Sequence, residues 1–256
     1  MEHSTLSRHF LTGLSCEALP QGEYYSAIPA LQQIAKEGLT FSAPITFFAG
    51  ENGMGKSTLI EGIAVAAGFN PEGGSRNFSF ATAETHSGFY RHLTLLRGYR
   101  RPRDGFFLRA ESFYNATSYI DRLDEIPAAA PPISMSYGGK SLHTLSHGEA
   151  FLTLVVERFG GNGLYILDEP EAALSPSRLL ALLERICTLA AEGSQFLIAT
   201  HSPILMACPH SELFWLGEDG IRLCHYTQTE HYRLTRSFLE EPEIYLKHLT
   251  GELPPR

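Results

Sequence analysis

The stretch Gly50-Glu51-Asn52-Gly53-Met54-Gly55-Lys56-Ser57 decides the fold, because it matches the phosphate-binding pattern G-x-x-x-x-G-K-[ST] at every fixed position. Its glycines let the backbone wrap around a polyphosphate with its N–H groups pointing inward. Lys56 supplies a mobile positive charge to the β- and γ-phosphates, and the Ser57 hydroxyl can ligate Mg²⁺. At this composition the pattern is expected by chance only roughly 0.005 times. The loop therefore predicts a nucleoside triphosphate as ligand.

The residues on either side of the loop support this interpretation. Residues 45–49 (Ile-Thr-Phe-Phe-Ala) are typical of a short buried strand, and residues 57–67 are typical of a helix. The N-terminus of that helix would direct its partial positive charge at the bound anion. A strand, a glycine-rich loop and a helix in this order favour a phosphate site over an incidental glycine turn.

Length and composition bound the class of protein. A chain of 256 residues with 43% apolar residues can form one large α/β domain or two small ones. No segment approaches the ~18 apolar residues of a membrane span. Residues 1–20 lack a secretory signal, and the four cysteines form no C-x-x-C pair. We therefore expect a cytoplasmic protein with free thiols.

The charge pattern leaves nucleic acid open as a partner. A formal net charge of −8 argues against the broadly basic surface of a nonspecific DNA binder. Five arginines nevertheless fall between Arg97 and Arg109. We expect two strands there, at residues 92–96 and 106–110, joined by a turn at 102–105. This hairpin either binds nucleic acid or presents solvated arginines.

Strands and helices alternate along most of the remaining chain. We expect helices at residues 114–123, 148–159, 176–192 and, with an interruption at Pro242, 230–249, and strands at 163–167, 195–199, 213–216 and 221–225. Apolar strands separated by helices predict an α/β fold with a mostly parallel sheet that is covered on both faces. The last two strands predict a terminal hairpin.

A second motif ends the strand at residues 163–167. There four apolar residues are followed by Asp168 and Glu169, 112 residues after Lys56. In an open α/β sheet, ligands bind at the carboxyl ends of strands. We expect Asp168 to hold Mg²⁺ and Glu169 to act as the general base that accepts a proton from the attacking water. Without a phosphate-binding loop, the same residues would indicate only a strand followed by an acidic helix cap.

Two short segments complete the set of motifs. Leu145-Ser146-His147-Gly148-Glu149 precedes the Asp-Glu strand, and Ala199-Thr200-His201-Ser202-Pro203 follows the next strand. In this order the motifs resemble those of ABC-type ATPases, and most closely the soluble branch of SMC, RecF and OLD-like proteins. In that branch the loop reads Gly-Glu-Asn-Gly-x-Gly-Lys-Ser-Thr, as here through Thr58, and the later strand ends Asp-Glu-Pro-Glu, as at residues 168–171. The resemblance covers about residues 40–216.

The resemblance implies a P-loop NTPase fold of the ABC-ATPase type. It implies a mostly parallel sheet flanked by helices, an antiparallel β lobe and a small helical lobe. We expect a single domain over residues 1–256, with residues 70–144 as an inserted β/helical lobe. The implied ligands are ATP and Mg²⁺.

The resemblance also implies an ATP-dependent homodimer. Ser146 and Gly148 would cap the γ-phosphate bound to a second subunit, with the dipole of the following helix behind them. Residues 172–175 would form a dimer-contact loop, and His201 would sense the γ-phosphate. Two ATP molecules would then be enclosed between the two phosphate-binding loops and the two copies of residues 145–149, which we call the signature.

Several residues depart from the family pattern. His147 replaces a small residue of the signature, Glu149 replaces a frequent Gln, and Ser175 stands where many relatives carry Asp. A Gln expected near the end of the middle strand is missing, and Glu111 is the nearest candidate for its role. The i, i+4 spacing of His143 and His147 would suit a metal, but two histidines in a loop without a third ligand are weak evidence for one.

Three functions fit these residues. The first is an ATPase whose ATP-driven dimerisation acts on nucleic acid or an effector protein in repair or defence, without coiled-coil arms, because only 90 residues separate Lys56 from Ser146. The second is the nucleotide-binding subunit of a membrane transporter. The third is a nucleotide-gated binding module with little hydrolysis, which the intact Lys56, Asp168, Glu169 and His201 disfavour.

Overall fold

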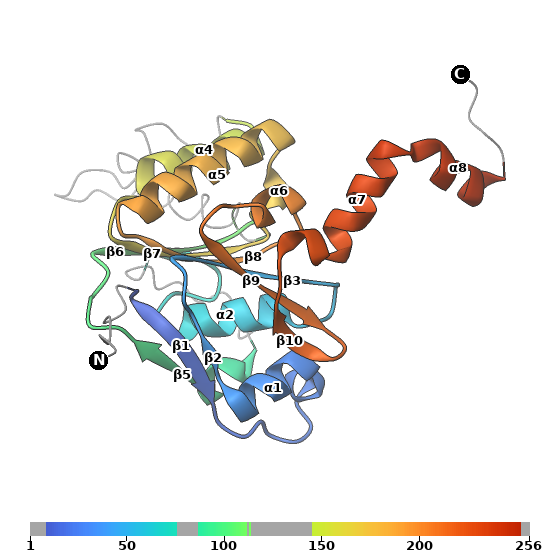
Figure 1. The fold of residues 1–256 in the computed structure, drawn as a ribbon. Helices are drawn as coiled ribbons and strands as arrows, with labels where there is room; N and C mark the ends of the chain where they lie inside the picture. The colour runs from blue at the N-terminus through green and yellow to red at the C-terminus, as the bar shows by residue number, and fades with distance from the viewer. Residues whose placement is uncertain (1–8, 76–86, 112, 114–144, 252–256) are drawn as a thin grey trace, which may run out of the picture.

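The computed structural model describes residues 9–75, 87–111, 113 and 145–251 of the chain. These residues form an α/β structure in which two sheets lie on either side of helix α2 (Lys56–Ala66). Figure 1 shows the larger sheet across the middle of the molecule, with α4 and α5 on its other face. The predicted α/β class with a sheet covered on both faces is confirmed.

Among the described residues, the main sheet has seven strands in the order β10-β9-β3-β8-β7-β6-β4. The five central strands are parallel, whereas β10 and β4 run antiparallel to their neighbours. The carboxyl ends of β3, β8 and β7 therefore meet at one edge of the sheet. The strands are β3 (Ile45–Gly50), β4 (Gly74–Ser75), β6 (Asp104–Arg109), β7 (Gly163–Asp168), β8 (Gln195–Ala199), β9 (Ser211–Gly217) and β10 (Gly220–Leu223).

A second, antiparallel sheet contains β2 (Leu39–Thr40), β1 (Leu11–Cys16) and β5 (Leu93–Arg97) in that order. The predicted hairpin between residues 92–96 and 106–110 is wrong, because β5 pairs with β1 in this sheet while β6 pairs with β7 in the main sheet. Burial explains the difference. Residues 105–108 of β6 are all buried, as suits a central strand, whereas β5 is largely exposed on one side.

The helices predicted at residues 57–67, 148–159, 176–192 and 230–249 agree closely with the structure, whereas those at residues 29–37 and 203–206 were not predicted. The α-helices are α1 (Pro29–Glu37), α2, α4 (His147–Arg158), α5 (Pro176–Ala191), α6 (Pro203–Met206), α7 (Glu230–Glu240) and α8 (Pro242–Thr250). The 3-10 helices are η1 (Tyr24–Ala27), η2 (Gly88–His92), η5 (Pro170–Ala173) and η6 (Tyr226–Gln228). The predicted break at Pro242 and the terminal hairpin β9–β10 are confirmed. The predicted helix at 114–123 lies outside the described residues.

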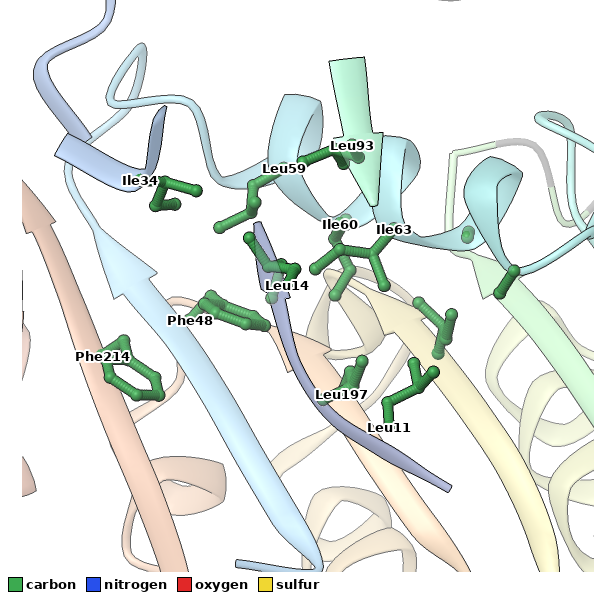
Figure 2. Close-up of a cluster of buried hydrophobic side chains, with 14 of the residues drawn as sticks. Leu11, Leu14, Ile34, Phe48, Leu59, Ile60, Ile63, Leu93, Leu197 and Phe214 are labelled. Atoms are coloured by element: carbon green, nitrogen blue, oxygen red, sulfur yellow. The ribbon is translucent and has the colours of Figure 1, made fainter. Parts of the chain in front are cut away.

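Helix α2 is held by apolar contacts on two sides. Figure 2 shows Leu59 and Ile63 of α2 in one cluster with Leu14 of the small sheet and with Phe48 and Leu197 of the main sheet. All five side chains are fully buried. Each such side chain contributes about 1.5–3 kcal/mol by its removal from water. The first turn of α2, which carries the phosphate-binding loop, is therefore fixed from both sheets.

A second core fills the opposite face of the main sheet. Phe47, Tyr165 and Phe196 point from the strands toward α4 and α5, and the rings of Phe159 and Tyr165 stack with their centroids 4.1 Å apart. The division of the chain into one domain with an inserted lobe at 70–144 stays a prediction, although β4 and β6 from that range belong to the main sheet. Within the described part of the chain, no helix combines the length and apolar character needed to cross a membrane.

Candidate active site

The phosphate-binding loop connects β3 to α2. Its residue Gly55 has a left-handed backbone, with φ at 88°, and a Cβ on Gly50 would lie 2.1 Å from the carbonyl oxygen of Leu216 on β9. A side chain is therefore excluded where the loop leaves the sheet. The buried Lys56 ammonium donates to the carbonyl oxygens of Gly50 and Glu51, each at 2.9 Å. The loop is folded around this charge, as a phosphate cradle requires.

Asp168 and Ser57 meet at the adjacent strand end. The Asp168 carboxylate is buried, with Oδ1 3.3 Å from Ser57 Oγ and Oδ2 3.3 Å from Nε of Arg109. Burial raises the pKa of Asp168 to about 6, and the Arg109 guanidinium opposes that shift. Hydroxyl and carboxylate oxygens are the ligands that Mg²⁺ prefers, and Mg²⁺ in such sites is shared with substrate phosphates. The pair Ser57 and Asp168 fits that role.

The next residue, Glu169, has an unusual backbone. Its φ of 49° and ψ of 52° place it in the left-handed region, which costs a non-glycine residue about 1–3 kcal/mol. The conformation is held by hydrogen bonds from Glu169 N to Ala199 O (3.0 Å) and from Ala172 N to Glu169 O (3.1 Å). Its side chain is 42% exposed, and Oε1 lies 3.4 Å from Nε2 of His201. A strained backbone that directs a carboxylate toward the loop is typical of a functional position.

His201 sits between the two strand ends, because β8 lies between β3 and β7. The loop that carries it is held by Glu171, whose Oε1 accepts hydrogen bonds from Thr200 Oγ1 (2.8 Å), Ser202 N (3.2 Å) and His201 N. Burial of the Glu171 carboxylate raises its pKa. The fourth residue of Asp-Glu-Pro-Glu therefore fixes the backbone of the histidine loop.

The side chain of His201 faces three charged or titratable groups. Its Nε2 is directed at Glu169, and its Nδ1 lies 2.9 Å from Nε2 of His231. Burial lowers the pKa of His201, and the nearby charge of Lys56 lowers it further. These shifts favour a neutral imidazole, whose two nitrogens have different roles.

A pocket of about 440 Å³ opens beside these groups. Its lining includes Ser57, Arg109, Glu111, His147, Asp168 and Glu169. Glu111 is 89% exposed, with Oε2 4.0 Å from Nε of Arg109. That Glu111 replaces the family's Gln stays a prediction, but its place on this pocket is compatible with it. His143, the other half of the suggested metal pair, lies outside the described residues.

The signature lies at the start of α4, on the rim of the same pocket. Ser146 caps the helix: its Oγ lies 2.6 Å from Glu149 Oε2, and its backbone N donates to the same oxygen at 3.0 Å. Arg178 of α5 forms an ion pair with Glu149 at 2.9 Å. A Cβ on Gly148 would lie 2.5 Å from the carbonyl oxygen of Ala173, so α4 closely approaches η5 there. Ser146 itself is exposed.

Two family models match parts of the chain that contain these motifs. Residues 134–207 match the family described as "AAA domain, putative AbiEii toxin, Type IV TA system", and residues 30–102 match a family described as "AAA domain". The second match contains the phosphate-binding loop, and the first contains the signature, the Asp-Glu pair and His201. The chain contains a P-loop ATPase domain of the AAA/ABC type. This type of domain implies ATP hydrolysis.

Solved structures of two kinds align with most of the ATPase. They include a nucleotide-free ATP-binding cassette from an ABC transporter (15% identity, 92% of this chain and 98% of that one, TM-score 0.49). They also include cbiO1 from Clostridium perfringens, part of the ABC transporter complex cbiONQ (17% identity, 95% of this chain and 100% of that one, TM-score 0.47). A third is the SMC head domain from Thermotoga maritima (16% identity, 84% of this chain and 98% of that one, TM-score 0.40). The branch is not resolved by them. A search of curated proteins found no match.

The five arginines between residues 97 and 109 lie in different parts of the structure. Arg109 lies in the active site, where it contacts Asp168 and, at 2.8 Å, Glu61. Arg100 hydrogen-bonds Asn162. Arg97, Arg101 and Arg103 are exposed, and they precede β6, at the opposite end of that strand from the active site. Of the five arginines assigned to the predicted hairpin, three are therefore exposed on the surface.

The motifs identified most of this site, but three groups escaped them. Arg109 was assigned to the surface cluster, and neither Arg178 nor His231 belongs to a motif. Arg109 directly ends a strand that pairs residue by residue with β7, opposite Asp168. Recognising residues 104–109 as a central strand would have placed that arginine correctly. No local signal in the sequence indicates that His231 contacts His201.

Proposed function

We propose that the ATPase forms an ATP-dependent homodimer with two shared active sites, and that the closed dimer acts on an effector protein. The observation that carries this proposal is the position of the signature. His147, the first residue of α4, lines the pocket together with Ser57 and Asp168, and Ser146 next to it is exposed, so the surface surrounding the site includes a helix N-terminus. A second subunit placed on this surface would present the same helix N-terminus to the phosphates.

Within one subunit, Lys56 and the loop N–H groups would hold the β- and γ-phosphates. Mg²⁺ bound by Ser57 and Asp168 would supply positive charge to the phosphate oxygens. Glu169 would accept a proton from the attacking water, and its fixed backbone keeps the carboxylate beside His201. His201 would donate a hydrogen bond to the γ-phosphate from Nε2.

Between subunits, Ser146 and the N-terminus of α4 would complete the partner's site. In the single chain Ser146 interacts with Glu149, and Arg178 balances the charge of that carboxylate. Hydrogen bonds from Ser146, with the charge of Arg178 added, lower the pKa of Glu149. Arg178 therefore balances the negative charge of the ionised Glu149, so this carboxylate would repel a partner's phosphate less.

Two features favour a protein over nucleic acid as the partner on which the closed dimer acts. Only three of the five clustered arginines are exposed, on a chain with a net charge of −8. Helices α7 and α8 project from the body (Figure 1), and they expose large apolar side chains. These are Leu234, Phe238, Leu239, Ile244 and Leu249, with exposed fractions of 53%, 38%, 71%, 57% and 79%. Exposed apolar groups of this kind are typical of protein interaction surfaces. The toxin–antitoxin wording of one matched family supports a defence role.

The test uses Glu169→Gln, which keeps the shape of the side chain and removes its basicity. We expect ATP to bind, turnover to fall by about a hundredfold or more, and a dimer to persist on gel filtration with Mg·ATP. Glu184→Gln, on the exposed face of α5, is the matched control and should behave as wild type. Undiminished turnover in Glu169→Gln would reject the general base, and a monomer with bound ATP would reject the dimer.

The same variant can identify the partner. The Glu169→Gln variant, held closed with ATP, would be used to capture proteins and nucleic acids from the native cells. Lys56→Ala, which cannot close on ATP, is the open control. We expect a protein retained only by the closed form. A membrane protein would favour the transporter alternative, and nucleic acid alone would reject the effector-protein proposal.

A further inference from the structure

His231 connects the projecting C-terminal helices to the active site. It lies in the first turn of α7, and its Nε2 is 2.9 Å from Nδ1 of His201 and 3.3 Å from the carbonyl oxygen of Gly50. Its ring contacts Trp215 of β9 edge to face, with centroids 5.3 Å apart. The residue thus touches the histidine loop and the beginning of the phosphate-binding loop at once.

These contacts determine which nitrogens carry protons. A carbonyl oxygen can only accept a hydrogen bond, so the contact with Gly50 requires a proton on Nε2 of His231. The same N–H is shared between the Gly50 oxygen and the closer Nδ1 of His201, so that Nδ1 must be unprotonated to accept from it. In a neutral His201 the remaining proton lies on Nε2. This nitrogen is the one directed at Glu169 and the phosphate-binding side of the site.

The groups around His201 are compatible with this assignment. Burial disfavours a second proton on its ring, and so do Lys56 and His231, whereas Glu169 favours one. Among the described residues, no cluster of three or more His, Cys, Asp or Glu side chains could hold a metal between these histidines. The close pair is therefore explained by a hydrogen bond between two imidazoles.

We propose that His231 is a positioning residue for His201. By donating to Nδ1, it fixes the tautomer of His201 that presents Nε2–H to the γ-phosphate. It also makes the base of α7 part of the nucleotide site, so the projecting helices are joined to the group that contacts the phosphate. The inference rests on the proposed role of His201 in hydrolysis.

The first experiment measures steady-state ATP hydrolysis in two variants of His231. His231→Phe keeps a ring against Trp215 but has no donor, whereas His231→Gln places an amide N–H near the position of Nε2. We expect kcat to fall by about tenfold in His231→Phe, with KM within about twofold, and we expect His231→Gln to recover most of the rate. His248→Phe, on the exposed surface of α8, is the control. Equal rates in His231→Phe and wild type would overturn the inference.

Coupling to His201 separates a positioning role from a structural one. If His231 acts through His201, the double variant His201→Ala/His231→Phe should be no slower than His201→Ala alone. A further loss in the double variant would show that His231 acts by another route. A larger fall in His231→Gln than in His231→Phe would overturn the inference and indicate that the imidazole supports only packing.

A second readout does not depend on activity. In the nucleotide-free wild-type protein, the imidazole ¹⁵N NMR signals should show His201 with its proton on Nε2, and His231→Phe should show a mixture of tautomers. A proton on Nδ1 of His201 in the wild type would overturn the inference whatever the rates are. Wild-type turnover in His201→Ala would instead reject the role of His201 in the proposed function, while the NMR result would still decide the tautomer.

Discussion

The two sides of the proposed composite site are built differently. We call Lys56, Asp168, Glu169, Glu171 and His201 the nucleotide side, and Ser146, His147, Glu149 and Arg178 the signature side. Lys56 and Asp168 are at most 4% exposed, and the others on the nucleotide side are held by strand ends. On the signature side the side chains of Glu149 and Arg178 are 50% and 33% exposed.

This difference has an energetic consequence. In the interior, charges interact strongly and an unpaired polar group costs about 1–3 kcal/mol. Lys56 and Asp168 must therefore keep one geometry, and both are expected to be sensitive to substitution. An exposed ion pair such as that between Glu149 and Arg178 contributes little to stability, because water screens the two charges. The signature side can thus rearrange when a second subunit arrives.

The largest effect should come from Lys56→Ala on the nucleotide side. It removes the buried ammonium around which the loop folds, so we expect ATP affinity to fall by about a hundredfold or more. Lys36→Ala, on the exposed surface of α1, is the matched control. A fluorescence titration with a labelled ATP analogue measures both. Wild-type affinity in Lys56→Ala would contradict the cradle described for this loop.

Glu171→Ala should have the next largest effect. It leaves the Thr200 hydroxyl and the N–H groups of His201 and Ser202 without their acceptor, so we expect a loss of about 2–4 kcal/mol in the free energy of unfolding. Turnover should fall with it, because His201 loses its support. Glu171→Gln keeps an accepting oxygen and should lose less of both. Chemical denaturation and ATP hydrolysis measure the two quantities; an unchanged unfolding midpoint in Glu171→Ala would contradict the assigned role.

The same contrast explains what the sequence could predict. The nucleotide side is encoded by contiguous residues, since a strand end and its loop are adjacent in the chain. Motif spacing singled out Lys56, Asp168, Glu169 and His201, which the structure brings together at one edge of the sheet. Arg109, Arg178 and His231 reach the site from other elements. Their placement depends on strand order and helix packing, which no local pattern in this chain encodes. The hairpin expected at 92–110 failed for this reason: a turn-like sequence at 102–105 connects two different sheets.

Arg178→Ala tests the signature side and should have a smaller, more selective effect. Without the guanidinium, Glu149 keeps an uncompensated negative charge beside Ser146. We expect ATP affinity of the monomer within about twofold of wild type, and an ATP-dependent dimer weakened by about tenfold in sedimentation equilibrium, since each lost factor of ten corresponds to about 1.4 kcal/mol. The double change Arg178→Ala/Glu149→Gln removes the uncompensated charge and should restore the dimer. Loss of ATP binding by Arg178→Ala monomers would refute the division into two sides.

Arg101→Glu with Arg103→Glu should have the smallest effect, because these side chains belong to neither side of the site. They precede β6 at the end of the strand opposite to Asp168, so we expect turnover and ATP-dependent dimerisation within about twofold of wild type. A DNA-binding series at several salt concentrations provides the decisive comparison. If these arginines contact phosphates, the double variant loses about 0.9 from the magnitude of the logarithmic salt slope for each contact. A slope shared with wild type favours solvated arginines and leaves the effector protein as the partner, whereas a flattened slope would move nucleic acid ahead of it.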